Sequence, residues 1–101
     1  NFQLSFLLQS LDATPGGRTT AWRVEYGLGD SPTTFTTVTT NPAMLTTNLG
    51  TFASTAVAVN FGTALNNLNQ KVWIRIVTLA ATTGSGNRPS SAIDDVQLTW
   101  N

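Results

Sequence analysis

The sequence contains no histidine and no cysteine. The chain therefore has no imidazole to act as a general base at neutral pH, and no thiolate to act as a nucleophile. It also lacks the nitrogen and sulfur ligands that zinc sites use. These absences remove the commonest acid–base, triad and zinc chemistries, so we expect a protein that is not an enzyme and needs no cofactor.

Charge is also scarce. Five basic and five acidic residues among 101 give a formal net charge of zero, and only 10% of the residues are charged. Because binding to phosphate backbones and to anionic lipid headgroups depends on positive charge, we expect no nucleic-acid partner. The longest apolar stretch, Val72 to Leu79, is interrupted by Arg75 and is far shorter than a membrane span, so we expect no membrane insertion.

Threonine is the most frequent residue, asparagine, serine and glycine are common, and lysine occurs once. This composition predicts a neutral, hydroxyl-rich surface, which is typical of exported bacterial proteins rather than of an ordinary cytosolic domain. Because little like-charge repulsion keeps copies apart, such a surface also favours self-association. The expected location is extracellular or on the cell surface.

Apolar and polar residues alternate with a period of two along most of the chain, and β-branched and aromatic residues are abundant. The pattern predicts an all-β protein of about six strands, which span residues 2–11, 20–28, 33–40, 52–61, 71–80 and 92–100. Turn and loop residues separate them at 12–17, 41–48 and 81–91.

Position in the sheets can also be predicted from the apolar rows. Trp22, Val24 and Tyr26 share one face of their strand, and Ile74 and Ile76 share one face of theirs, which makes all five candidates for the core. The strands at 2–11 and 71–80 are expected to be central, whereas the threonine-rich segment at 33–40 is expected at an edge.

No composition shift divides the chain and no long repeat occurs, so residues 1–101 are predicted to form a single β-sandwich domain. Short strands with one apolar face, separated by polar loops, fit a sandwich that is jelly-roll-like. About six strands are few for such a fold. The sequence therefore leaves open a sandwich that is incomplete within one chain.

Four segments occur in an order that is similar to a known family: Leu4-Ser-Phe-Leu-Leu, Trp22-Arg-Val-Glu-Tyr26, Val72-Trp-Ile-Arg-Ile76 and Ala92-Ile-Asp-Asp-Val-Gln-Leu98. Together they resemble the concanavalin-like jelly-roll modules of exported bacterial proteins and, among eukaryotic proteins, the MAM domain. The resemblance implies a non-catalytic extracellular accessory or surface role. Modules of this family have additional strands before the equivalent of Phe2, so the resemblance also implies that the first strands are missing here.

Asp94 and Asp95 are adjacent, so in a regular strand they point to opposite faces and cannot form the facing carboxylate pair of a glycosidase. The alternation places Asp94 on the inward face with Leu98, where a carboxylate needs a partner such as Arg75. The expected role of Asp94 is therefore either a buried or half-buried ion pair with Arg75 or Arg23, or a turn-capping acid that accepts hydrogen bonds from backbone N–H groups. Asp94 and Asp95 are also the candidates for a Ca²⁺ site, because hard cations take oxygen ligands, but the chain has few other carboxylates and no metal is expected.

Aromatic side chains can form stacking platforms for sugars. Trp22, Tyr26 and Trp100 lie in apolar rows and are therefore predicted to pack in the core. Trp73 lies on the opposite face of its strand from Ile74, so it is predicted to lie outside, and it is the candidate residue for stacking on a sugar. An alternative function is thus a carbohydrate-binding accessory module with a polysaccharide partner.

The first strand predicts an assembly edge. It begins at the terminus, with no preceding strand to pair it, and it carries the apolar residues Phe2, Leu4, Phe6 and Leu7. An unpaired apolar edge favours strand addition from another chain. We therefore expect a non-catalytic extracellular structural or adhesive subunit that assembles with copies of itself, as a homo-oligomer or polymer, into a filament or surface layer.

Overall fold

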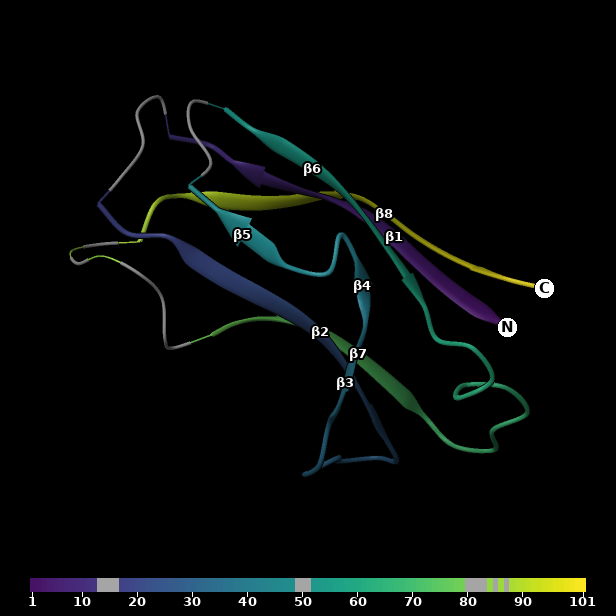
Figure 1. The fold of residues 1–101 in the computed structure, drawn as a ribbon. Helices are drawn as coiled ribbons and strands as arrows, with labels where there is room; N and C mark the ends of the chain where they lie inside the picture. The colour runs from purple at the N-terminus through teal and green to yellow at the C-terminus, as the bar shows by residue number, and fades with distance from the viewer. Residues whose placement is uncertain (13–16, 49–51, 80–83, 85, 87) are drawn as a thin grey trace.

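The computed structural model describes residues 1–12, 17–48, 52–79, 84, 86 and 88–101. These residues form eight strands and no helix, and the strands make two antiparallel sheets packed as a sandwich (Figure 1). The all-β sandwich expected from the alternating pattern is therefore confirmed. The strands are β1 (Phe2–Ser10), β2 (Thr20–Leu28), β3 (Thr36–Val38), β4 (Thr40–Asn41), β5 (Leu45–Thr47), β6 (Ser54–Asn60), β7 (Val72–Thr78) and β8 (Ser91–Trp100).

Within the described ranges there is no helix long and apolar enough to cross a membrane. The turn expected at residues 12–17 and the loop expected at 81–91 lie largely outside the described residues.

The first sheet has the order β4-β6-β1-β8, with β1 in its interior. β1 pairs with β6 along one edge and with β8 along the other. Its residues Leu4, Phe6 and Leu8 belong to the buried core, whereas Gln3 and Ser5, which alternate with them, are exposed on the outer face. The prediction of a central first strand is confirmed, because one fully apolar row is what a sheet interior requires.

β2 is the interior strand of the second sheet. It pairs with β7 along one edge, and with β5 and β3 at different positions along the other edge. Val24 lies opposite both Val38 and Ile76 and is fully buried, while Trp22 and Tyr26 pack against the same core. The predicted inward face of this strand is therefore confirmed.

Two features raise the number of strands from the six expected to the eight seen in the described residues. The segment at 33–40 is divided, because β3 pairs with β2 in the second sheet and β4 pairs with β6 in the first. In addition, β5 lies inside the segment expected to be a loop. The pattern did not reveal β5 because Pro42 interrupts the alternation just before this short strand.

The expectation that residues 71–80 form a central strand is wrong. β7 is an edge strand, and its pairing within the described residues is with β2 alone. Its inward residues Ile74 and Ile76 do pack against the core, as predicted. The outer face also carries apolar residues, Trp73 and Val77. Apolar residues on both faces are typical of a strand buried in the middle of a sheet, which is why a central position was predicted.

Hydrogen bonds connect the two sheets at one end of the core. The buried Thr47 hydroxyl on β5 accepts a hydrogen bond from Trp22 Nε1 on β2 at 3.1 Å. The same oxygen accepts a hydrogen bond from Ser91 Oγ, at the start of β8 in the other sheet, at 3.0 Å. A single hydroxyl thus links strands of both layers.

Candidate functional site

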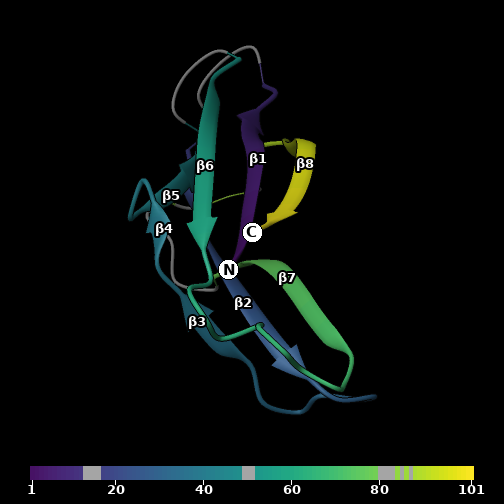
Figure 2. The same ribbon diagram turned by 90° about the vertical axis from the view of Figure 1, so that its right-hand side faces the viewer.

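One lateral side of the sandwich is open. β8 ends the first sheet and β7 ends the second, and among the described strands each has one neighbour, β1 and β2 respectively. Figure 2 shows β7 and β8 on the same side of the molecule, with β4 and β5 on the other side. We call the surface formed by β7 and β8, with their unpaired backbone edges, the open side.

The inner face of β8 carries exposed apolar side chains. Residues that lie opposite each other in an antiparallel pair point to the same side of the sheet, so Leu98, opposite the buried Leu4, points inward. The same register and the alternation along the strand place three further apolar residues on this face. The exposed fractions of the four residues are 38% for Ile93, 61% for Val96, 43% for Leu98 and 69% for Trp100. The core face of the first sheet therefore extends beyond the part that the second sheet covers.

The assembly edge predicted at Phe2, Leu4, Phe6 and Leu7 is wrong, because β1 is paired along both of its edges. Leu4 and Phe6 are core residues with exposed fractions of 5% and 2%. Phe2 is partly buried, and its ring centroid lies 6.2 Å from that of Trp100 on β8. Leu7 points to the outer face and is partly buried there. The exposed apolar edge lies on β8 instead.

A β-bulge in β8 changes the predicted orientation of Asp94. The register with β1 shifts so that Asp95 and Val96 together lie opposite the single residue Phe6, and Asp95 has a positive φ of 52°. This extra residue places Asp94 opposite Leu7, on the outer face. The prediction that Asp94 points inward is therefore wrong, because it assumed an unbroken alternation.

Among the described residues Asp94 forms no ion pair with Arg75 or Arg23, whose salt-bridge partner is Glu25. The partner of Asp94 is a backbone N–H group, which is the other kind of partner that the sequence left open. Asp94 is exposed, and its Oδ1 accepts a hydrogen bond from the backbone N–H of Asp95 at 2.8 Å. In the part of the chain that the structure describes, no group of three or more acidic side chains could hold a metal ion. The Ca²⁺ candidates Asp94 and Asp95 thus gain no third carboxylate from those residues.

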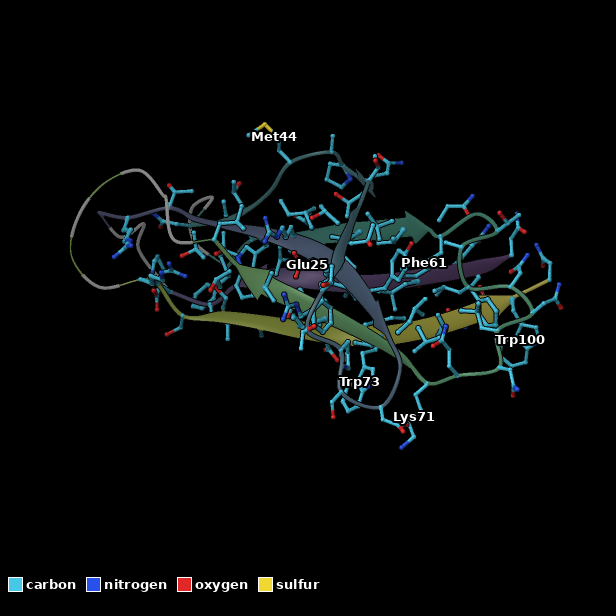
Figure 3. The ribbon with its side chains drawn as sticks, turned by 90° about the horizontal axis from the view of Figure 1, so that it is seen from below. Glu25, Met44, Phe61, Lys71, Trp73 and Trp100 are labelled. Atoms are coloured by element: carbon cyan, nitrogen blue, oxygen red, sulfur yellow. The ribbon has the colours of Figure 1, made fainter. Side chains whose placement is uncertain are left out.

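Glu25 is a buried carboxylate on the outer face of the second sheet, with an exposed fraction of 2% (Figure 3). Arg75 Nε lies 2.5 Å from its Oε1, and Arg23 Nε lies 2.7 Å from its Oε2. The hydrogen bond from Arg75 is the main reason that the pKa of Glu25 lies below its ordinary value, and the charges of both guanidinium groups act in the same direction against the effect of burial. We call these three residues the Glu25 cluster.

Phe35 covers the Glu25 cluster. The guanidinium carbon of Arg75 lies 3.5 Å from the centroid of the Phe35 ring, which is a cation–π contact. Gly27 makes room for this ring, since a Cβ atom there would lie 2.8 Å from Phe35 Cε2 and 2.9 Å from Pro32 Cβ. The cluster is therefore closely packed, and its arginines balance a buried charge.

Trp73 lies on the outer face of β7, as the alternation predicts, and is 47% exposed. Its Nε1 donates a hydrogen bond to the backbone oxygen of Gly29 at 2.8 Å, which fixes the orientation of the ring. Figure 3 places Trp73 beside Lys71 along one margin of the molecule. Trp100 was predicted to pack in the core and is instead exposed, because no described strand covers the inner face of β8.

A groove of about 600 Å³ runs across the outer face of the first sheet. Ser5 and Ala58, which lie opposite each other on β1 and β6, contribute small side chains at its middle. Its polar side chains are amides and hydroxyls, and no charged residue lines it: they include Gln3, Ser5, Asn41, Asn60, Gln97 and Thr99. These residues were not predicted as a site, although most of them are the polar residues that alternate with the predicted core residues in their strands.

Comparisons of the chain with protein-family models, with curated proteins and with solved structures find no match in any of the three. The class that the described residues define is a two-sheet β-sandwich with one open side, a neutral polar groove and a fixed surface tryptophan.

Proposed function

We propose that the chain is a non-catalytic structural or adhesive subunit that works outside the cell and associates with copies of itself through the open side. One observation carries this proposal: the inner face of β8 is apolar, yet Val96 and Trp100 are 61% and 69% exposed. In a β-sandwich, inward side chains normally pack against the facing sheet. Association with another copy of the chain would therefore bury the apolar inner face of β8.

The unpaired backbone groups of the edge strands also favour association through the open side. An edge strand presents a row of N–H and C=O groups that another strand can pair, and the apolar side chains beside them gain about 25 cal/mol for each Å² removed from water. The formal net charge of zero leaves no long-range repulsion between copies. Main-chain pairing and apolar burial therefore act together at β8.

The location and the absence of catalysis rest on composition and on the family resemblance. The threonine-rich, neutral surface is typical of exported proteins, and the absence of histidine and cysteine removes the commonest catalytic groups. The segments Val72 to Ile76 and Ile93 to Val96 resemble concanavalin-like and MAM-like modules. That resemblance suggests an accessory role at the cell surface.

Light scattering over a range of protein concentrations tests the association. We expect the unmodified chain to form complexes larger than one copy, and the double variant Val96→Asn, Leu98→Gln to stay monomeric. Thr99→Asn is the matched control, because Thr99 is on the outer face of the same strand, and it should associate like the unmodified chain. A monomeric unmodified chain at every concentration would contradict the proposal, as would equal association of the double variant.

A carbohydrate-binding accessory module is the second candidate function, and the polar groove on the first sheet favours it. Amide side chains such as Gln3 and Gln97 can pair with adjacent sugar hydroxyls through both a donor and an acceptor. Because the lining is uncharged, the ligand would be a neutral polysaccharide. Trp73 is the stacking candidate, but it is on the other sheet, so the groove and the tryptophan would be separate sites.

Calorimetric titration with neutral oligosaccharides tests this candidate. If the groove binds sugar, Gln97→Ala should weaken binding at least tenfold, which corresponds to about 1.4 kcal/mol, while Trp73→Ala leaves it unchanged. If Trp73 is the site, the two results are reversed. Absence of binding in the unmodified chain would rule the candidate out.

A further inference from the structure

On the basis of the proposed self-association, we infer that two copies join around a two-fold axis, with β8 of each copy pairing with β7 of the other. The inference concerns the identity and the arrangement of the partner at the open side. It follows from the directions of the two strands, from their charges and from their exposed inner faces.

The directions of the strands permit this pairing. β7 and β8 end different sheets but lie on the same side of the molecule, and they run in opposite directions (Figures 1 and 2). A two-fold axis parallel to the strands and beside the open side keeps the direction of every strand. It places β8 of one copy next to β7 of the other in the antiparallel orientation, and it does so twice. Each sheet then continues into the opposite sheet of its partner.

The charges of the strands select this arrangement over a pairing of β8 with itself. β8 carries Asp94 and Asp95 and no basic residue, whereas β7 carries Arg75, follows Lys71, and has no acidic residue. Two copies of β8 aligned at their middles would bring carboxylates together, which is unfavourable for directly opposed like charges. Aligning the middles of β8 and β7 instead sets Asp95 near Arg75.

The bulge at Asp95 and the carboxylates of Asp94 and Asp95 also limit which strands can pair with the free edge of β8. Charged residues and bulges are devices by which proteins discourage unselective pairing at an edge strand. Asp94 and Asp95 are exposed, so a partner strand without basic residues would leave them unpaired. A partner that presents Arg75, whose side chain is 46% exposed, converts the same feature into an attraction.

The inner faces then cover one another. Val96, Leu98 and Trp100 of each copy meet the inward residues of β7 and β8 from the other copy, among them Val72, which is 37% exposed. The arrangement closes on itself, because the same two edges of both copies are used. The open side alone therefore gives a dimer, and a filament or surface layer would need a different contact.

Cysteine cross-linking tests the arrangement directly, because the chain contains no cysteine of its own. Two single variants, Gln97→Cys on β8 and Trp73→Cys on β7, are mixed and treated with a short bismaleimide. Both residues lie on outer faces, and aligning the strand middles places them across the junction. Thr37→Cys on β3, an exposed residue on the other edge of the second sheet, is the control partner.

We expect the mixed sample to give cross-linked dimers of Gln97→Cys with Trp73→Cys in severalfold excess over dimers of either variant alone, and Thr37→Cys to give none. A predominance of dimers between two Gln97→Cys chains would show β8 paired with β8 and would overturn the inference while leaving self-association in place. Complexes much larger than two copies that the double variant Val96→Asn, Leu98→Gln abolishes would also overturn the closed dimer, because they would show that the open side itself joins more than two copies. A monomeric mass with no cross-link would overturn both the inference and the proposed function.

Discussion

Leu4 and Leu98 lie directly opposite each other in the antiparallel pair of β1 and β8, yet Leu4 is 5% exposed and Leu98 is 43% exposed. Both side chains point to the same side of the same sheet. The exposed fractions differ because the second sheet covers the inner face of β1 but does not cover the inner face of β8 at Leu98. The boundary of the covered core therefore passes between these two neighbouring residues.

This boundary predicts unequal costs of truncation. Leu4→Ala should lower the free energy of unfolding by about 2 to 5 kcal/mol, because it leaves a cavity in the core. Leu98→Ala should cost only about 1 kcal/mol, because nearly half of the Leu98 surface is already exposed in the single chain and its removal leaves no closed cavity. Urea unfolding at a protein concentration low enough to keep copies apart compares the two. Equal costs would mean that the inner face of β8 is covered within the chain.

Thr20 and Thr47 form a second matched pair, since they lie opposite each other on β2 and β5 and are both 1% exposed. Thr47 Oγ1 accepts two hydrogen bonds, whereas Thr20 Oγ1 has no hydrogen-bond partner among the described residues. Thr47→Val should destabilise the fold by about 1 to 3 kcal/mol, because two partly buried donors, Trp22 Nε1 and Ser91 Oγ, lose their acceptor. Thr20→Val should be neutral or stabilising, because it replaces an unsatisfied buried hydroxyl with a methyl group.

Thermal unfolding of the two valine variants at neutral pH makes the comparison. The shape of the side chain is nearly the same in both substitutions, so packing changes are matched. A loss of stability in Thr20→Val as large as that in Thr47→Val would contradict the assignment of the hydrogen bonds.

We expect the folded chain to become less stable in acid because of Glu25. Its pKa is lowered in the folded chain, mainly by the hydrogen bond from Arg75, so the ionised form favours folding. This contribution is fully present above the ordinary glutamate pKa of about 4.3 and is lost as the pH falls through the lower pKa of the folded state. Melting temperatures measured from pH 7 down to pH 3 should therefore fall.

Glu25→Gln should melt at a lower temperature than the unmodified chain at pH 7, and its melting temperature should depend less on pH. Asp30→Asn is the control, because Asp30 is 89% exposed and lies 3.8 Å from Lys71, a separation at which a surface ion pair contributes little. If Asp30→Asn flattens the pH dependence as much as Glu25→Gln does, Glu25 is not the group responsible.

The alternation of apolar and polar residues predicts which side chains point to the core, provided that the strand is regular. The row that contains Trp22 and Val24 in β2 was assigned to the core correctly because this strand is regular and covered on its inner face. Leu4 and Phe6 share one apolar row of β1, as the alternation predicts, but they were assigned to an assembly edge and lie in the core instead. The orientation of Asp94 was wrong because the bulge at Asp95 adds one residue, and a single added residue reverses the faces of the strand.

The candidate site was less predictable because it depends on contacts between distant parts of the chain. β8 pairs with β1 across almost the full length of the sequence, as in the pairing of Phe2 with Trp100. No local pattern reports that pairing, nor whether a facing strand covers Trp100. The outward position of Trp73 could be predicted, since it depends only on the alternation beside Ile74.

The crossing of the chain from β3 to β4 has a mechanical consequence. Val38 belongs to the second sheet and Thr40 to the first, so the single residue Thr39 joins the two layers along the side remote from β7 and β8. A connection of one residue leaves no slack, so it holds the two sheets at a fixed separation along that margin. The chain between the end of β7 at Thr78 and the start of β8 at Ser91 is longer, so the covalent chain imposes no such limit at the open side.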